Sequence, residues 1–494
     1  MLAWTIYTSF LGMFVLMLLP ADDKRLVRGV ALLTALAGLA CALGGAMGAA
    51  AGVATIVKVP WIHSLGIEFH LAADGISLTL VVLTGIAAVV GVLFSWNIET
   101  RVKEFFAFFF ALIGGVYGVF LSFDLFLLFV FYEIAIIPKY FLIAIWGSTN
   151  REYGAMKLAL YSFVGSAMVL IGLIASNVVS GLHTFDLARL AAFPFPESFQ
   201  YWAFPLVFVG FAILAGLWPF HTWAPTGHVA APTAASMLLA GVVMKLGAYG
   251  CLRVAMTLFP LGLLAWQNEV ALLAVIGIVY GAMVALVQKD FKFVIGYSSV
   301  SHMGFVLLGL VTLNEIGLSG AVLQMFSHGI IAGLLFAVVG RMVYDRTHTR
   351  DLGELEAMGL NKAMPFAAVT FVVAGFASMG LPGFSGFVAE LQVLIGAWEK
   401  LPGFALLAGL GILIGVGYTL RAMHKAFFAD KEAASAEHSH HEQMEPISVP
   451  ERFGAVILIA ASLVIGLYPR LLLDIIVPSF ASPLFDGLRK AGGL

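Results

Sequence analysis

Long apolar runs separated by short polar loops make up most of this chain. A helix of about 20 apolar residues spans the roughly 30 Å hydrocarbon core of a bilayer. Because the runs are continuous and do not alternate with polar residues, they indicate helices. The pattern predicts an all-α membrane protein with about 14 transmembrane helices, centred near residues 11, 42, 86, 112, 134, 168, 211, 245, 277, 303, 330, 376, 413 and 462. The first run lacks a basic leader and a small-residue cleavage site, which favours a retained helix over a signal peptide.

Two predicted helices contain breaks, at 215–228 with Pro219 and at 379–387 with Pro382. Proline removes a backbone donor, and such backbone is tolerated at membrane depth only beside protein or water. One interrupted helix in each half of a chain is typical of transporters built from inverted repeats. We therefore divide the single polytopic domain, residues 1–494, into N-terminal helices (1–100), a five-helix repeat (104–257), a second five-helix repeat (268–429), a polar loop (430–451) and a last helix with a tail (452–494).

The Lys and Arg residues predict the orientation of the helices. Of the 26 such residues, most of those in loops fall on one set of alternate loops, for example at 24–28, 289–292 and 341–350. Loops rich in Lys and Arg stay in the cytoplasm. We therefore expect both termini to face outward, on the periplasmic side of a bacterial inner membrane.

Composition excludes several classes of function. The chain is 61% hydrophobic and 11% charged, which a soluble fold of this length cannot accommodate. Its two cysteines, Cys41 and Cys251, are too few for an iron–sulfur cluster or a cysteine zinc site. No basic patch points to nucleic acid. The polar loop contains His438, His440 and His441, for which we favour a solvated loop over a metal site.

Four charged residues lie inside the apolar runs: Glu133, Lys139, Lys245 and Glu390. A charge at the centre of a membrane helix costs roughly 2.5–3.5 kcal/mol on insertion scales, so membrane charges of both signs indicate ion movement. We predict that the ion is a proton, with sodium as the alternative. Glu133 and Lys139 would form a switchable pair; the alternatives are an ion pair that only joins helices, and a Lys139 that reaches toward the interface.

Lys245 is the predicted central relay, because the glycine and alanine residues around it leave space for water and close helix contact. Glu390 follows the second break and can reach water, so we predict an exit site there; a polar patch that serves the broken helix is the alternative. His302 and His328 are membrane histidines flanked by hydroxyls, and histidine titrates near neutral pH. They would carry protons or organise water, unless they are hydrogen-bonded core residues.

Two further histidines, His221 and His228, flank the first break. With Pro219 and Pro382 they form the predicted gating elements. The simpler alternative is that they cap backbone groups that the break leaves unpaired.

Taken together and in order, these segments resemble the M-type (chain 4) antiporter-like membrane subunits of respiratory complex I, the proton-pumping NADH:quinone oxidoreductase. The resemblance covers nearly the whole chain. Its strongest carriers are Glu133 with Ile137 and Pro138, Pro219–Trp223, Ala231–Thr233, Lys245–Gly250, Lys289–Lys292, Tyr297–Gly304, Gln324–Gly329, Tyr344–Arg350 and Gly386–Glu390.

The resemblance implies fourteen helices with two inverted five-helix repeats, and proton translocation without redox chemistry in this chain. It matches Glu133 to the family's helix-5 glutamate, Lys245 to its helix-8 lysine and Glu390 to its helix-12 acid. NADH, FMN, iron–sulfur clusters and quinone would bind to other subunits. The partners would be L- and N-type antiporter-like chains and the lipid bilayer. A subunit of a cation/proton antiporter or of a membrane-bound hydrogenase is the alternative.

The sequence departs from the family pattern at one functional position. The family carries a lysine on helix 7 before the first break, where this chain has Leu214. An acid usual in that break is Thr226 here. Because an unexpected lysine stands at 139, our hypothesis is that Lys139 replaces the missing cation as the partner of Glu133.

Overall fold

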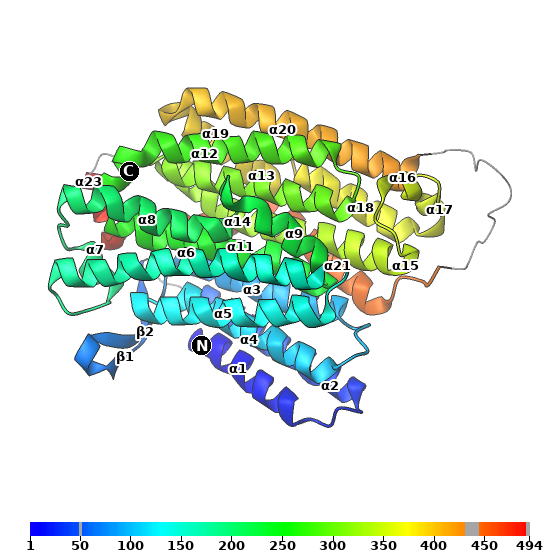
Figure 1. The fold of residues 1–494 in the computed structure, drawn as a ribbon, viewed down its shortest axis with the longest axis horizontal. Coiled ribbons are helices and arrows are strands. Elements are labelled where there is room, and N and C mark those ends of the chain that lie inside the picture. Colours follow the sequence, from blue (N-terminus) through cyan, green and yellow to red (C-terminus); the bar gives the residue numbers. More distant parts are fainter. Residues whose placement is uncertain (49–51, 430–443, 491–494) are drawn as a thin grey trace.

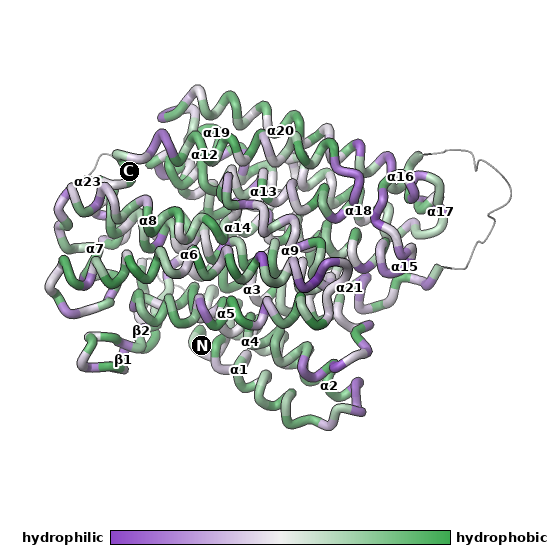
Figure 2. The backbone as a smooth tube through the Cα atoms, viewed as in Figure 1, coloured by the Kyte–Doolittle hydropathy of each residue, from purple (hydrophilic) through white to green (hydrophobic). Residues whose placement is uncertain are grey.

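The computed structural model describes residues 1–48, 52–429 and 444–490. Most of the long helices run side by side along the longest axis of the molecule (Figure 1). Apolar residues dominate along these helices, as expected for a bundle surrounded by lipid (Figure 2). In the described part of the chain, 12 helices are long and apolar enough to cross a membrane. The predicted all-α membrane fold is confirmed.

Every predicted helix centre lies inside an observed helix. Twelve fall in the helices that are long and apolar enough to cross a membrane. The other two fall in shorter apolar helices, α1 (Ala3–Leu18) and α18 (Pro365–Ser378). The count of fourteen crossings therefore stays a prediction.

The N-terminal part contains the one β-sheet found among the described residues, a two-stranded antiparallel hairpin that we did not predict. Its first strand carries β-branched residues near Thr55, a local signal for a strand. The hairpin defines one end of the bundle, which we call the hairpin side (Figure 1). After α1, the elements of this part are α2 (Lys24–Met47), β1 (Ala54–Ile62), the 3₁₀ turn η1 (His63–Leu65), β2 (Ile67–Ala73) and α3 (Gly75–Phe94).

The following segment, proposed from the sequence as a first repeat, contains the first broken helix and two π-helical stretches, η3 and η4. Its elements are α4 (Val102–Leu121), α5 (Leu125–Trp146), α6 (Arg151–Ser180), α7 (Leu187–Ala191), α8 (Glu197–Ala215), η2 (Phe220–Thr222), α9 (Trp223–Ala230), α10 (Thr233–Leu238), η3 (Leu239–Val243), α11 (Met244–Gly250) and η4 (Cys251–Met256).

The next segment contains the second broken helix and ends, like the first, in a π-helical stretch. Its short helices lie at the end of the bundle opposite the hairpin, which we call the basic side (Figure 1). The elements are α12 (Pro260–Val287), α13 (Phe291–Val311), α14 (Glu315–Phe336), η5 (Ala337–Tyr344), α15 (Asp345–Thr347), α16 (Leu352–Leu355), α17 (Leu360–Ala363), α18, α19 (Ser385–Lys400), α20 (Pro402–Met423) and η6 (His424–Phe428).

The C-terminal part begins with a capping box, in which Ser448 and Glu451 satisfy each other's backbone amides. The described part of the tail after it, up to residue 490, contains short helices. The predicted histidine cluster at His438–His441 lies outside the described residues. The elements are α21 (Val449–Leu467), α22 (Arg470–Ser479), η7 (Pro483–Phe485) and α23 (Asp486–Lys490).

Both predicted breaks interrupt a helix. In the first, α8 ends at Ala215 and α9 begins at Trp223, with Pro219 between them. In the second, α18 ends at Ser378 and α19 begins at Ser385, with Pro382 between them. The gating role of these prolines stays a prediction.

Candidate functional site: a buried file of titratable side chains

Lys245 lies on α11, directly after the π-helical stretch η3, and is fully buried. A π-helical turn shifts the backbone register of a helix. The Lys245 Nζ donates a hydrogen bond to the carbonyl of Ala240, which lies within η3. Gly247 lets α11 approach α8 closely, because a Cβ there would lie 2.4 Å from the carbonyl oxygen of Phe211. The local sequence thus places a lysine in the protein interior.

Lys245 is the first member of a buried row of titratable side chains, which we call the file. The next member is His328 of α14. Lys245 Nζ lies 2.7 Å from His328 Nδ1, and both side chains are buried. The ring of His328 lies against that of His302 on α13, with 5.5 Å between the ring centroids. His328 Nε2 is buried and has no hydrogen-bond partner among the residues that the structure describes.

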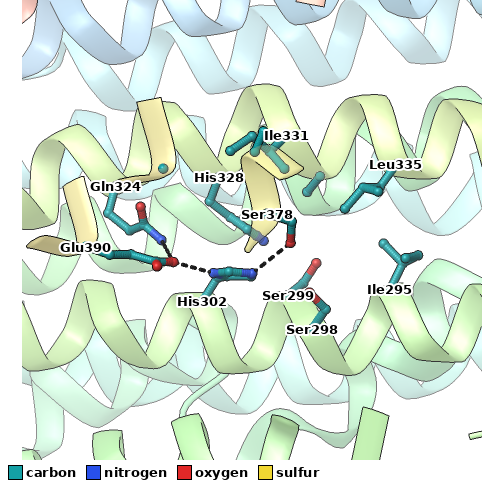
Figure 3. A pocket seen from close by; sticks show the side chains of 13 residues that line it. Ile295, Ser298, Ser299, His302, Gln324, His328, Ile331, Leu335, Ser378 and Glu390 are labelled. Atoms are coloured by element: carbon teal, nitrogen blue, oxygen red, sulfur yellow. Dashed lines mark hydrogen bonds and ion pairs between the residues drawn. The ribbon is translucent and has the colours of Figure 1, made fainter. Parts of the chain in front are cut away.

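His302 connects the file to Glu390 on α19 (Figure 3). His302 Nδ1 lies 2.8 Å from Glu390 Oε1, and His302 Nε2 lies 3.2 Å from Ser378 Oγ. Gln324 Nε2 donates to the same Glu390 oxygen at 3.2 Å. These residues line a cavity with about 10 Å³ of room for water, roughly one molecule. The structure therefore brings Lys245, His328, His302 and Glu390 together in one buried polar file.

The second break shapes the end of this file. Gly380 has a φ of +70°, a conformation that glycine adopts readily. A Cβ at this position would lie 3.2 Å from Glu390 Oε2. The break thus leaves room for the carboxylate at the start of α19.

Glu133 and Lys139 do not form the direct pair that we expected. Among the described residues, the Lys139 nitrogen and the Glu133 carboxylate oxygens do not come within the 4.0 Å of an ion pair. Lys139 is buried and donates to Ser162 Oγ at 3.2 Å, and the Ser166 hydroxyl lies beside the Glu133 carboxylate. Ser162 and Ser166 are one turn apart on α6, so they share a face. Each of the two charged residues therefore contacts a hydroxyl on the same face of α6.

The histidines of the first break are both buried, and neither ring makes a side-chain hydrogen bond. His221 packs edge-on against Tyr280, with 5.3 Å between centroids, and His228 lies 5.1 Å from the ring of Phe336. His221 interacts with the backbone of Pro219 within the break, so gating and backbone capping both stay open as predictions. Leu214, at the position of the family's lysine, is buried and apolar.

A polar cavity of about 370 Å³, which we did not predict, lies on the basic side. Its lining includes Arg341, Asp345 and His348, together with Lys292 of α13. Lys292 is buried, and its Nζ donates to the carbonyl of Ala231 at 3.0 Å. This carbonyl follows the last residue of α9, so the cavity reaches the backbone at the end of the first broken helix.

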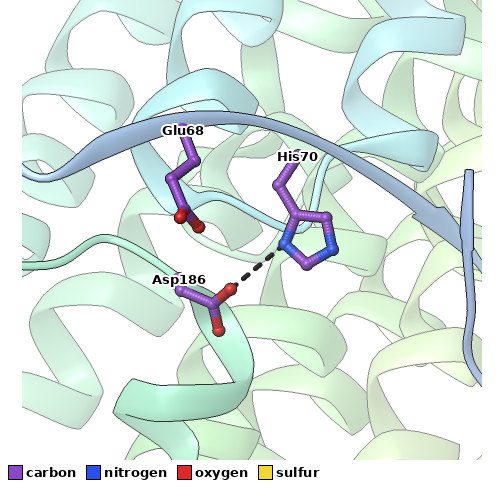
Figure 4. A group of neighbouring side chains, drawn as sticks. All are labelled: Glu68, His70 and Asp186. Carbon is purple, nitrogen blue, oxygen red and sulfur yellow. Dashed lines mark hydrogen bonds and ion pairs between the residues drawn. The ribbon is translucent and has the colours of Figure 1, made fainter. Parts of the chain in front are cut away.

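A second polar cluster lies on the hairpin side and contains Glu68, His70 and Asp186 (Figure 4). Lys58 Nζ lies 2.7 Å from Asp186 Oδ2 and 3.1 Å from Glu68 Oε2, and His70 Nδ1 lies 3.1 Å from Asp186. Burial raises the pKa of Asp186, but the contacts with His70 and Lys58 outweigh burial and hold the pKa below its ordinary value. Since the Lys58 ammonium already supplies the cation, the cluster fits a contact that docks the hairpin better than a metal site.

An interrupted-helix bundle with a buried file of titratable side chains defines a class of protein, the ion-coupled membrane transporters. Within that class, the family described as "NADH:quinone oxidoreductase/Mrp antiporter, TM" matches residues 122–415, more than half of the chain. The chain belongs to this family, which confirms the resemblance drawn from the sequence.

Relatives match over most of their length. The NADH-quinone oxidoreductase subunit M of Rhodobacter capsulatus is 38% identical over 436 residues, covering 85% of this chain and 82% of that protein. The NADH-quinone oxidoreductase subunit M of Pseudomonas aeruginosa is 36% identical over 495 residues, covering 96% of this chain and 95% of that protein.

Solved structures share the fold. A chain of respiratory complex I from Thermus thermophilus with bound NADH matches with a TM-score of 0.90 and 28% identity, covering 100% of both chains. A chain of the Mrp complex from Dietzia sp. matches with a TM-score of 0.85 at 22% identity, covering 100% of this chain and 98% of that one. At 22% identity, the match to the Mrp chain supports a shared fold and nothing further.

Proposed function

We propose that this protein is a proton-translocating, antiporter-like subunit of the membrane arm of an NADH:quinone oxidoreductase. The observation that carries this proposal is the buried file from Lys245 through His328 and His302 to Glu390. Four titratable side chains in contact inside an apolar bundle are costly, and their arrangement suits proton relay. We expect NADH, FMN, iron–sulfur clusters and quinone to bind to other subunits.

In this proposal a proton enters on the basic side. The cavity beside Lys292 would admit water as far as the end of the first broken helix. From there a proton reaches Lys245 past His228, which lies in the last turn of α9, just before Ala231. Gating at Pro219 and His221 would control this entry.

The file then carries the proton sideways. Lys245 gives a proton to His328 Nδ1 while His328 Nε2 releases one to water in the small cavity. His302 passes the proton to Glu390, from which it leaves toward the hairpin side next to Pro382. The sequence analysis already offered His302 and His328 as proton carriers, and the contacts suggest the order in which they act.

We further propose that Lys139 takes the role of the lysine that Leu214 replaces. The contacts of Ser162 and Ser166 with Lys139 and Glu133 would let the two charges respond to each other. A change in their separation would alter the potential at Lys245, because charges interact strongly in a poorly screened interior. This coupling would tie pumping to conformational change in neighbouring subunits.

The proposed inverted repeats gain support from two matching backbone bridges. Asp124 pairs with Asp186 on the hairpin side, and Asp290 pairs with Asp351 on the basic side. Each of the four aspartates caps a helix start with its side chain. We propose that the hairpin side is periplasmic and the membrane is the bacterial inner membrane, with L- and N-type chains as partners.

A multi-subunit cation/proton antiporter is the second candidate, because the family includes the Mrp antiporters and the fold matches an Mrp chain. Purifying the native assembly and identifying its co-migrating subunits separates the two. Peripheral subunits with redox centres support the first proposal, and antiporter subunits alone support the second.

The relay itself is tested with Lys245→Ala in the native assembly. We expect assembly to persist and NADH-driven proton uptake into proteoliposomes to be lost. Leu246→Met is the matched control, because Leu246 is an equally buried neighbour and the change nearly conserves volume. Full pumping by the Lys245→Ala variant would overturn the proposed function.

A further inference from the structure

A second polar file begins at Tyr249, four residues after Lys245, and leads toward the hairpin side. Tyr249 and Arg253 follow Lys245 at intervals of four residues, so all three tend to share a helix face. Arg253 Nε donates to the Tyr249 hydroxyl at 3.2 Å, and this hydroxyl lies 3.1 Å from Ser77 Oγ. Arg253 Nη2 donates to Asp74 Oδ1 at 2.6 Å. Asp74 caps the start of α3, so the file runs from mid-membrane to a helix end.

The Asp74–Arg253 pair is sealed from solvent. Both side chains have 0% exposure. Three rings surround the guanidinium, with centroids 5.2 Å (Phe123), 5.3 Å (Tyr249) and 5.8 Å (Phe485) from Arg253 Cζ. Arg253 Nη1 and Asp74 Oδ2 are buried, and within the described part of the chain neither has a hydrogen-bond partner. The aromatic rings hold the pair in a tightly packed setting.

The hairpin covers this pair from outside. The backbone amide of Phe123 donates to the carbonyl of His70 on β2 at 2.9 Å, and the two rings lie 6.1 Å apart. His70 in turn contacts Asp186 in the cluster that docks the hairpin. The ion pair therefore lies between Lys245 and the hairpin side, beneath the docked hairpin.

We propose that Arg253, fixed by Asp74, is an electrostatic plug that closes the direct route from Lys245 to the hairpin side. A guanidinium keeps its proton in proteins, so it cannot relay one. Its positive charge lies beside the Tyr249 hydroxyl and repels an incoming proton, as fixed arginines do in selective pores. A proton on Lys245 must therefore pass sideways to His328. This inference rests on the proposed function, because it takes Lys245 as the relay.

The test is the passive proton conductance of proteoliposomes that contain the whole assembly, measured without NADH or quinone under a potassium diffusion potential. Asp74→Asn/Arg253→Gln removes both charges and keeps polar side chains of similar shape. We expect conductance to rise by about tenfold or more once the repulsive charge is gone. Adding Lys245→Met to the double variant should return conductance to the parent level, because the opened route begins at Lys245.

A matched control neutralises another buried ion pair. Arg346 and Glu451 lie 2.8 Å apart, each with 2% exposure, on the basic side. Arg346→Gln/Glu451→Gln should leave conductance at the parent level. If the Asp74 and Arg253 double variant does not assemble, Arg253→Gln alone keeps the helix cap and carries the same expectations.

Two results would overturn the plug. One is an assembled variant with conductance within about twofold of the parent, which is too small a change for removal of a charge barrier. The other is a leak that persists with Lys245→Met, because its route would not include Lys245. Normal NADH-driven pumping by a Lys245→Met single variant would instead overturn the proposed function. The failure of the plug and the failure of the proposed function are therefore distinguishable.

Discussion

Replacing His328 with leucine removes the ring that joins the two halves of the proposed relay. Lys245 Nζ lies 2.7 Å from His328 Nδ1, a contact that leucine cannot make. Leucine also removes the polar His328 Nε2 from the lining of the cavity that has room for about one water, so a water there loses a partner for the step. Glu390 and His302 keep their own contact at 2.8 Å, so the damage is confined to one link.

The size of the effect follows from that lost contact. A hydrogen bond to a charged group contributes about 1.5–3 kcal/mol. If the proton-transfer step loses this stabilisation, its rate falls by roughly 10-fold to 150-fold. We therefore expect NADH-driven proton uptake by His328→Leu proteoliposomes to slow by at least about tenfold.

The assay compares three quantities in purified assemblies: proton uptake, electron transfer from NADH to quinone, and electron transfer from NADH to an artificial acceptor that bypasses the membrane arm. The last should be unchanged, which shows that the assembly is intact. Leu323→Met, at a buried position on the same helix, is the matched control. Parent-level proton uptake by His328→Leu would refute the reasoning.

Three further predictions follow from single contacts. Lys139→Met should keep assembly and lower proton uptake by about tenfold, measured as above, because the proposed partner charge of Glu133 is lost; unchanged uptake would refute the replacement hypothesis. Gly380→Ala should lower the thermal unfolding midpoint, because a positive φ costs about 1 kcal/mol in other residues and the new Cβ crowds Glu390. Asp186→Asn should raise hydrogen exchange at 54–73 about tenfold, since a charged contact of about 1.5 kcal/mol is lost; protection equal to the parent would contradict the docking role.

The membrane fold was predictable because lipid restricts the possible structures. Apolar length determines where a helix can cross, and every predicted centre lies in a helix. Both breaks were visible as well, since proline and glycine within an apolar run interrupt a helix. The hairpin was not found, because strands β1 and β2 are short and pair outside the apolar runs.

The site was predictable as a set of residues but not as a geometry. Lys245, His302, His328 and Glu390 were recognisable because each is costly in an apolar segment. Their order along the file depends on how α11, α13, α14 and α19 pack, which one sequence does not specify. Ser162, Ser166 and Gln324 were missed because uncharged polar residues are common in membrane helices. Arg253 was counted as a loop residue because it stands near a helix end, and only the structure pairs it with Asp74.

The central claim is that Lys245 and Glu390 belong to one path, and a pair of partial defects tests it most directly. Lys245→His and Glu390→Asp each keep a titratable group at the position and should slow NADH-driven proton uptake without stopping it. In a single path the slower step limits the flux, so the double variant should pump nearly as fast as the slower single variant. A double variant whose loss equals the sum of the two separate losses would contradict the account, because the two residues would then serve independent routes.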